Sequence, residues 1–135
     1  MIRLEDIHKI YRMGEVEVGA LQGVTVTIDE GDMVAIMGPS GSGKSTLMNL
    51  LGCLDTPNTG TYHLEGLDIK SLDGNRLAEI RNRRIGFVFQ SFNLLPRATA
   101  LENIELPLLY GRVSNPKALA RSAMEKVGLG HRALH

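Results

Sequence analysis

The order of apolar and polar positions divides the chain into short strands and longer helices. Residues 2–10 alternate apolar and polar side chains in part, and residues 20–28 end in a β-branched run, so both are predicted as strands. Residues 61–65 are predicted as a further strand before a glycine turn. Residues 33–37 and 85–89 are short, continuous apolar runs, which indicate buried strands.

Helical spacing appears between and after these strands. A helix is predicted from residue 44 to about residue 54, where a stretch rich in Asp, Thr, Pro, Asn and Gly ends it. Residues 75–84 and 116–127 are predicted as further helices. Residues 101–110 have helical spacing, but Pro107 weakens that prediction. Strands at the start and helices at the end indicate an α/β fold with an added β layer.

Composition narrows the class of protein. The 135 residues are 43% hydrophobic, which suits one modest packed domain and argues against disorder. The net charge is zero, with 15 basic and 15 acidic residues, so nucleic-acid binding driven by bulk charge is not expected. Cys53 is the only cysteine, which excludes an internal disulfide and favours a reducing, cytosolic setting. Residues 1–6 lack the apolar core of a signal peptide and no apolar run approaches the length of a membrane span, so neither is expected within this sequence.

The stretch between the apolar run 33–37 and the helix from residue 44 carries the clearest chemical signal. It matches the phosphate-binding loop pattern G-x-x-x-x-G-K-[ST] at every fixed position. The predicted nucleotide-binding residues are Gly38, Pro39, Ser40, Gly41, Ser42, Gly43, Lys44, Ser45 and Thr46.

Each residue type in this loop has a physical reason. Glycines let the backbone curl so that its N–H groups converge on phosphate oxygens, and the following helix directs its N-terminal dipole at the anion. Lys44 is predicted to reach the β- and γ-phosphates, and the Ser45 hydroxyl to ligate Mg²⁺. The alternative is a Gly/Ser-rich turn without function, but such a turn has no reason to place Lys-Ser between a strand and a helix.

Several further stretches, read together with the loop, resemble the ATP-binding subunit of ABC transporters. Within that family the sequence is most similar to the macrolide-exporter and lipoprotein-releasing group. The resemblance covers the N-terminal portion of such a subunit. The stretches, in chain order, are 10–14 with Tyr11, 20–24, 31–46, 51–57, 59–60, 85–96 and Glu102–Asn103.

The resemblance implies a fold and its parts. The fold class would be α/β, a P-loop NTPase with a RecA-like core, an antiparallel β subdomain and a truncated helical subdomain. Residues 1–30 and 60–70 would belong mainly to the β subdomain. The core with the Q-loop would take residues 31–59 and 71–95, and residues 96–135 would begin the helical subdomain. In the family's sheet, strands from the part not present here flank residues 33–37, whose edge would then be unpaired.

The resemblance also assigns site residues and partners. Tyr11 would stack on the adenine of ATP, unless it is only a core or strand-edge tyrosine. Gln90 would be the Q-loop glutamine, with Mg²⁺ or the attacking water at its amide oxygen. Residues 92–96 would form an apolar surface for the membrane-spanning permease, unless they pack on the chain's own helices. A second ATP-binding subunit would pair head to tail, at the cytoplasmic face of the membrane.

The groups that family members need for hydrolysis are absent from these 135 residues. No apolar run after the loop ends in Asp-Glu, and the Leu-Ser-Gly-Gly-Gln signature and switch histidine are missing. We therefore expect an incomplete ATP-binding subunit of a transporter that couples ATP hydrolysis to export or to extraction of lipid-linked substrates, with no catalytic residue and no turnover of its own. The alternatives are a catalytically silent regulatory truncation that pairs with a full subunit and, more remotely, a P-loop phosphotransferase.

Overall fold

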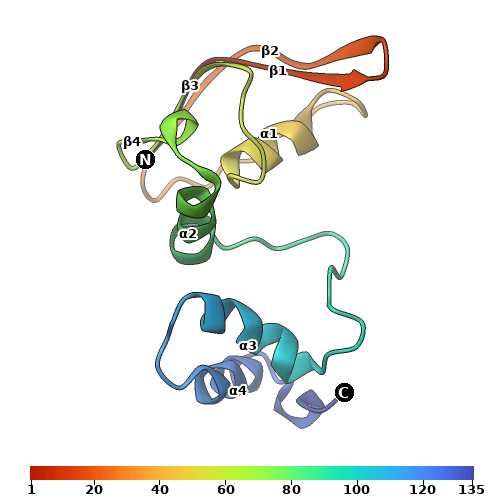
Figure 1. Cartoon of the computed structure of the whole chain (residues 1–135), viewed down its shortest axis with the longest axis vertical. Helices are drawn as coiled ribbons and strands as arrows, with labels where there is room; N and C mark the ends of the chain where they lie inside the picture. The colour runs from red at the N-terminus through yellow and green to blue at the C-terminus, as the bar shows by residue number, and fades with distance from the viewer. The chain divides into compact units, whose positions relative to one another are not determined.

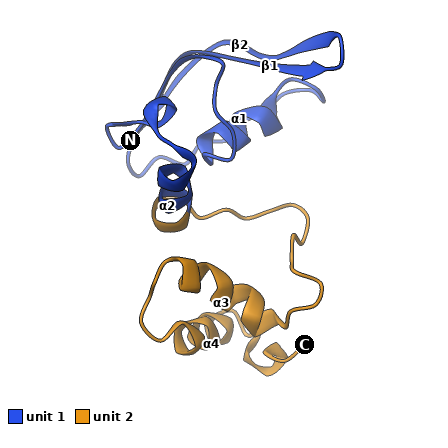
Figure 2. Ribbon diagram, viewed as in Figure 1, with its two compact units in different colours: residues 1–81 blue, residues 82–135 orange.

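The computed structural model describes all 135 residues, which form two compact units, residues 1–81 and 82–135 (Figure 2). The first contains the strands β1 (Ile2–Met13), β2 (Val16–Ile28), β3 (Thr59–Leu64) and β4 (Leu67–Asp68), helix α1 (Lys44–Leu51) and the 3₁₀ turn η1 (Ile69–Ser71). Helix α2 (Gly74–Arg84) crosses the boundary between the units. The second contains α3 (Ala100–Tyr110), α4 (Pro116–Lys126) and the turn η2 (Gly130–Arg132) (Figure 1).

The four strands form one antiparallel sheet in the order β2-β1-β3-β4. β1 and β2 form a hairpin in which Ile2 lies opposite Ile28 and Met13 opposite Val16. The predicted strands 2–10, 20–28 and 61–65 are confirmed, and the first two extend further toward the hairpin turn than expected.

A bulge in β1 explains why the alternation along residues 2–10 is only partial. Leu4 and Ile7 are both fully buried although they are three positions apart, which in a regular strand would place them on opposite faces. β1 has one residue more than β2 between Leu4 and Ile7, and one more than β3 between Glu5 and His8. Asp6, inside both stretches, has a positive φ of 48°. The extra residue returns Ile7 to the buried face.

The core of the first unit lies between the sheet and α1. Leu4, Ile7 and Tyr62 from the sheet are fully buried, and Leu50 of α1 is 1% exposed. The Tyr62 hydroxyl donates a 2.8 Å hydrogen bond to the carbonyl oxygen of Leu51, the last residue of α1. This bond connects the end of the helix to the middle of the sheet.

Residues 33–37 and 85–89 are not strands, and the prediction of two buried strands is wrong for this structure. Met33 is fully exposed and Met37 is 88% exposed, and Val88 is 97% exposed in the second stretch. Neither stretch joins the sheet, whose four members are antiparallel and lie elsewhere in the chain. An apolar run becomes a strand only where a neighbour supplies hydrogen-bond partners, and no strand supplies them here.

The second unit is a helical pair. α3 begins with a capping box in which Thr99 and Glu102 exchange hydrogen bonds, and it continues through Pro107. Leu101 of α3 packs with Ala120 and Met124 of α4. The helices predicted at 75–84, 101–110 and 116–127 are therefore confirmed to within one residue at each end. No helix of the chain is both long and apolar enough to cross a membrane.

Candidate functional site: a phosphate-binding loop and an aromatic platform

The phosphate-binding loop leads directly into the first turn of α1. Gly43 stands at the N-cap with φ 88°, and no side chain caps the helix. The first backbone N–H groups of α1 therefore have no partner within the helix. A Cβ at position 43 would lie 2.4 Å from the carbonyl oxygen of Ala20 in β2, so only glycine lets the loop pass this close to the hairpin.

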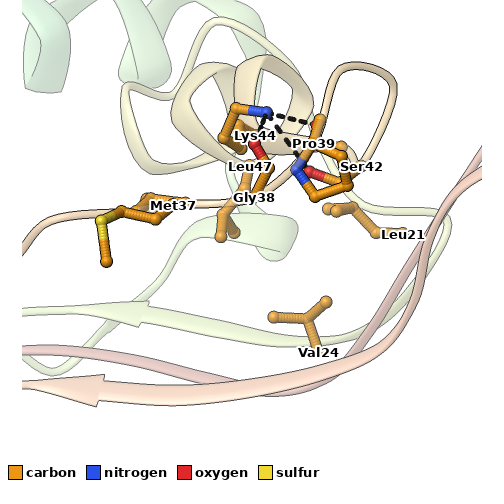
Figure 3. A pocket seen from close by; sticks show the side chains of 10 residues that line it. Leu21, Val24, Met37, Gly38, Pro39, Ser42, Lys44 and Leu47 are labelled. Atoms are coloured by element: carbon orange, nitrogen blue, oxygen red, sulfur yellow. Dashed lines mark hydrogen bonds between the residues drawn. The ribbon is translucent and has the colours of Figure 1, made fainter.

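A pocket of about 250 Å³ opens beside the loop (Figure 3). Its polar part comes from the loop, and its apolar part comes from β2, the stretch before the loop and α1. The lining residues are Leu21, Val24, Ile36, Met37, Gly38, Pro39, Ser42, Gly43, Lys44 and Leu47.

Lys44 lies across this loop and donates to its oxygen atoms. The Nζ atom is 2.9 Å from the carbonyl oxygen of Gly38, 2.6 Å from that of Pro39 and 3.3 Å from the Ser42 hydroxyl (Figure 3). All three partners are neutral, so no carboxylate compensates the charge of the ammonium group. A cation beside unpartnered N–H groups forms an environment that attracts an anion.

The two hydroxyl residues after Lys44 differ in exposure. Ser45 is exposed in the first turn of α1, whereas Thr46 is partly buried. The Ser45 hydroxyl is a hard oxygen ligand of the kind that Mg²⁺ accepts. The chain has no cluster of three or more His, Cys, Asp or Glu side chains that could hold a metal ion. Mg²⁺ at this position would therefore take most of its ligands from phosphate oxygens and water, which is its usual habit.

Tyr11 lies on β1 near the hairpin turn, in the same unit as the loop. The residue is 36% exposed, and its hydroxyl donates a 2.9 Å hydrogen bond to Asp55 Oδ2. Asp55 also accepts a 2.6 Å bond from Lys9, whose Nζ atom lies over the Tyr11 ring at 5.1 Å from its centroid. We call Lys9, Tyr11 and Asp55 the aromatic platform.

Charge and burial act in opposite directions on the pKa of Asp55. Burial of the carboxyl would raise it, but the hydrogen bonds from Lys9, the Thr56 backbone and Tyr11 outweigh burial and hold the pKa below its usual value of 3.8. Asp55 is therefore ionised at neutral pH.

Gln90 belongs to the second unit and is exposed, and its assignment to the nucleotide site stays a prediction.

The apolar stretch 92–96 is exposed. Phe92 is 92% exposed and Leu94 is 61% exposed, so the side chains of this stretch are not covered by the unit's own helices. Phe87 and Phe89 stack with their ring centroids 5.0 Å apart.

The sequence patterns do not predict the roles of two residues that organise the structure. Asp55 lies in the stretch 51–57, where no pattern indicates a contact with Tyr11. Asn103 accepts from the backbone N–H of Leu95 at 2.8 Å and donates to the carbonyl oxygens of Ala98 and Thr99, which ties down the turn before α3. A polar side chain directly beside Glu102 in the first turn of a helix was the available signal.

Comparison with known proteins identifies the family. The ABC transporter family description matches residues 21–135. The chain is 53% identical, over all of its length, to an uncharacterized ABC transporter ATP-binding protein of Thermotoga maritima. It is also 51% identical, over 96% of its length, to the macrolide export ATP-binding/permease protein MacB of Syntrophobacter fumaroxidans. The chain spans 58% of the first of these relatives and 19% of the second.

Solved structures similar to this chain belong to the same family. A dimeric structure of the ATP-binding cassette MJ0796, in a post-hydrolysis state bound to ADP and Pi, matches with a TM-score of 0.90 and 44% identity. The match covers all of this chain and 61% of that one. The α/β fold of the P-loop NTPases predicted from the sequence is therefore confirmed. The phosphate loop, the fold and these relatives lead to one conclusion: the chain belongs to the ABC transporter family, with the ATP-binding proteins of its macrolide-exporter type among its close relatives.

Proposed function

We propose that the chain binds Mg·ATP and forms the first part of the ATP-binding subunit of an ABC transporter. The observation that carries this proposal is the uncompensated ammonium group of Lys44, held across the loop beside the uncapped first-turn N–H groups of α1. A polyphosphate would take the place of the two loop carbonyls and offer Lys44 anionic partners instead.

The proposed roles follow from the positions of the side chains. The loop backbone from Gly38 to Thr46 would cradle the phosphates, and Lys44 would move from loop oxygens to the β- and γ-phosphates. Ser45 would hold Mg²⁺, which when bound neutralises phosphate charge. Tyr11 would receive the adenine ring. From the resemblance we assign Gln90 to the Q-loop, where its amide oxygen would contact Mg²⁺ or the attacking water.

The proposed partners are a membrane-spanning permease and a second ATP-binding subunit in a head-to-tail dimer, which would place the protein at the cytoplasmic face of the membrane. MJ0796 forms a dimer and MacB joins an ATP-binding part to a permease, which supports both partners. The exposed side chains of Phe92 and Leu94 provide an apolar surface of the kind that a permease could contact. The work done would be export or the extraction of lipid-linked substrates.

Titration calorimetry with Mg·ATP tests the proposal. Lys44→Ala should weaken binding at least about tenfold, because a hydrogen-bonded charge contact contributes on the order of 1.5–3 kcal/mol. Lys126→Ala is the matched control, since Lys126 is an exposed lysine at the end of α4 in the other unit. Equal affinities for Lys44→Ala and the parent chain would refute the proposal.

We further propose that these 135 residues bind ATP without hydrolysing it, because they contain no Asp-Glu strand end after the loop and no signature sequence. Phosphate release should stay at the level of the Lys44→Ala variant. Turnover that this substitution abolishes would show that the chain carries its own catalytic groups.

A further inference from the structure

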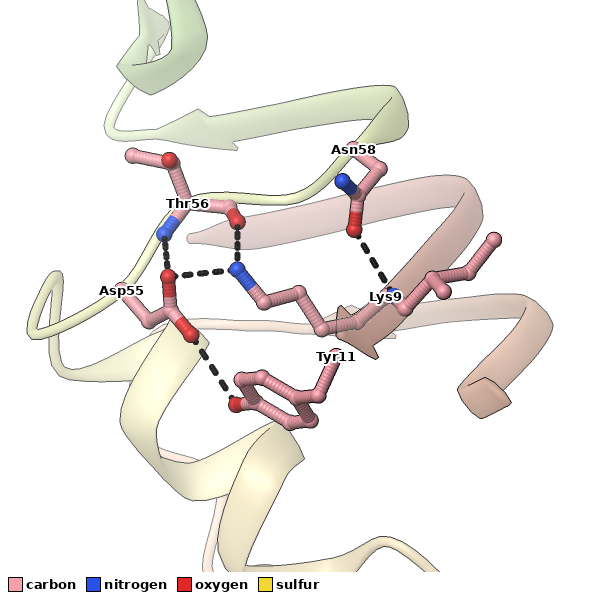
Figure 4. Close-up of polar contacts among 6 residues, drawn as sticks. Lys9, Tyr11, Asp55, Thr56 and Asn58 are labelled. Carbon is pink, nitrogen blue, oxygen red and sulfur yellow. Dashed lines mark hydrogen bonds and ion pairs between the residues drawn. The ribbon is translucent and has the colours of Figure 1, made fainter. Parts of the chain in front are cut away.

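The aromatic platform connects Tyr11 to the helix that carries the phosphate loop. Asp55 follows α1, and its backbone N–H donates to the carbonyl oxygen of Asn49 within that helix at 3.3 Å. The Asp55 carboxylate in turn accepts a hydrogen bond from the Tyr11 hydroxyl (Figure 4). α1 thus holds the phosphate loop at one end and the partner of Tyr11 just beyond the other, about 12 Å along its axis for eight residues.

The two oxygen atoms of the Asp55 carboxylate accept hydrogen bonds from different partners. Oδ1 accepts from Lys9 Nζ at 2.6 Å and from the Thr56 backbone N–H at 2.7 Å, which fixes the rotation of the carboxylate. Oδ2 is left for Tyr11 at 2.9 Å (Figure 4). Lys9 also donates to the Thr56 carbonyl oxygen at 2.8 Å, and its side chain is only 12% exposed. The carboxylate is therefore held in place before any ligand arrives.

The backbone of β1 is fixed to the same stretch. Asn58 accepts from the backbone N–H of Ile10 at 2.7 Å through Oδ1 and donates its own N–H to the carbonyl oxygen of His8 at 2.9 Å. Lys9 and Tyr11 lie two positions apart on the strand, so their side chains share a face. Because the Lys9 ammonium lies over one face of the Tyr11 ring, a base can stack only on the opposite face.

We propose that Asp55 is a positioning residue for nucleotide binding, which holds the Tyr11 ring at a fixed orientation and leaves one of its faces for the purine. The inference rests on the proposed binding of ATP, and it assigns to Asp55 and Lys9 a role beyond packing. A ring held in advance loses less conformational freedom when the base arrives, and immobilising one side chain costs about 0.5–1.5 kcal/mol of binding.

The test compares Mg·ATP with inorganic tripolyphosphate, which has phosphates but no base, on the 135-residue chain. Asp55→Ala should weaken ATP binding about threefold to tenfold, the factor that corresponds to one freed side chain, and leave tripolyphosphate binding unchanged. Tyr11→Phe keeps the ring and the exposed position but removes the hydroxyl, so it should weaken ATP binding by a similar or smaller factor. The double variant should be no weaker than Asp55→Ala alone, because both substitutions break the same hydrogen bond.

Tyr11→Ala distinguishes base binding by Tyr11 from the positioning role of Asp55. If it weakens ATP binding but Asp55→Ala and Tyr11→Phe do not, Tyr11 binds the base without help and the positioning role is wrong. If even Tyr11→Ala has no effect, the assignment of Tyr11 to the base fails, and the positioning role fails with it. A loss of tripolyphosphate affinity equal to the loss of ATP affinity in Asp55→Ala would show a general structural role and overturn the proposal. Binding of both ligands by Tyr11→Phe, which leaves the Lys9–Asp55 pair in place, checks the result against misfolding.

Discussion

The phosphate loop and the aromatic platform lie in the same unit but are built in different ways. The loop is formed by nine consecutive residues, and its shape depends on glycine conformations and on the start of one helix. The platform joins residues that are 44 and 46 positions apart, through side chains only. Local backbone conformation therefore determines the first region and tertiary packing determines the second. Substitutions should affect the two regions in correspondingly different ways.

The largest effect is expected in the loop. Gly43→Ala combines a φ of 88° with a Cβ only 2.4 Å from the Ala20 carbonyl oxygen, so the loop or the hairpin must move. We expect a loss of about 2–4 kcal/mol in the free energy of unfolding, together with loss of ATP binding. Urea unfolding followed by circular dichroism measures the first, and calorimetry measures the second.

Gly41→Ala is the matched control for this prediction. Gly41 has a similar φ of 79°, but nothing lies within 4 Å of a Cβ added there. It should carry only the conformational strain, about 1 kcal/mol. Equal losses for the two variants would mean that the close approach to β2 is not what requires glycine at position 43.

A smaller effect is expected at the bond that holds α1, the helix between the two regions, on the sheet. Tyr62→Phe removes the hydroxyl that donates to Leu51 at the end of α1, and the freed carbonyl oxygen loses this partner in a part-buried position. We expect a loss of about 1–2 kcal/mol in the free energy of unfolding. An unchanged midpoint in urea would contradict a role for this bond in holding α1 on the sheet. Tyr110→Phe, at an exposed tyrosine of the other unit, should change nothing.

The smallest effect concerns pH and the platform alone. Since hydrogen bonds hold the pKa of Asp55 below 3.8 in the folded chain, the unfolded chain takes up this proton at a higher pH. The contribution of Asp55 is therefore complete above the unfolded value of 3.8 and is lost as the pH falls through the lower folded value. Asp55→Asn should lower stability at pH 6 by no more than about 1 kcal/mol for this partly exposed pair, and the difference from the parent chain should shrink as the pH falls below 3.8. A constant difference across this range would contradict the ionised pair.

Much of the secondary structure was predictable because it is local. The helices at 75–84, 101–110 and 116–127 follow from spacing and from residues that favour helix ends, such as Pro116 in a first turn. The apolar runs 33–37 and 85–89 also have strand-like patterns, but they are not strands in the structure. An apolar run shows that a segment can be a strand, but pairing depends on neighbours that are distant in sequence.

The candidate site divides in the same way. The sequence by itself determined the phosphate loop, because consecutive glycines, Lys44 and Ser45 act through backbone geometry that they themselves create. Only the tertiary structure decided that Asp6 forms a bulge, that Gly43 passes against Ala20, and that Asp55 meets Lys9 and Tyr11. The physical reason is that a hydrogen bond between distant side chains depends on where the sheet and α1 pack together, and no local pattern records that position.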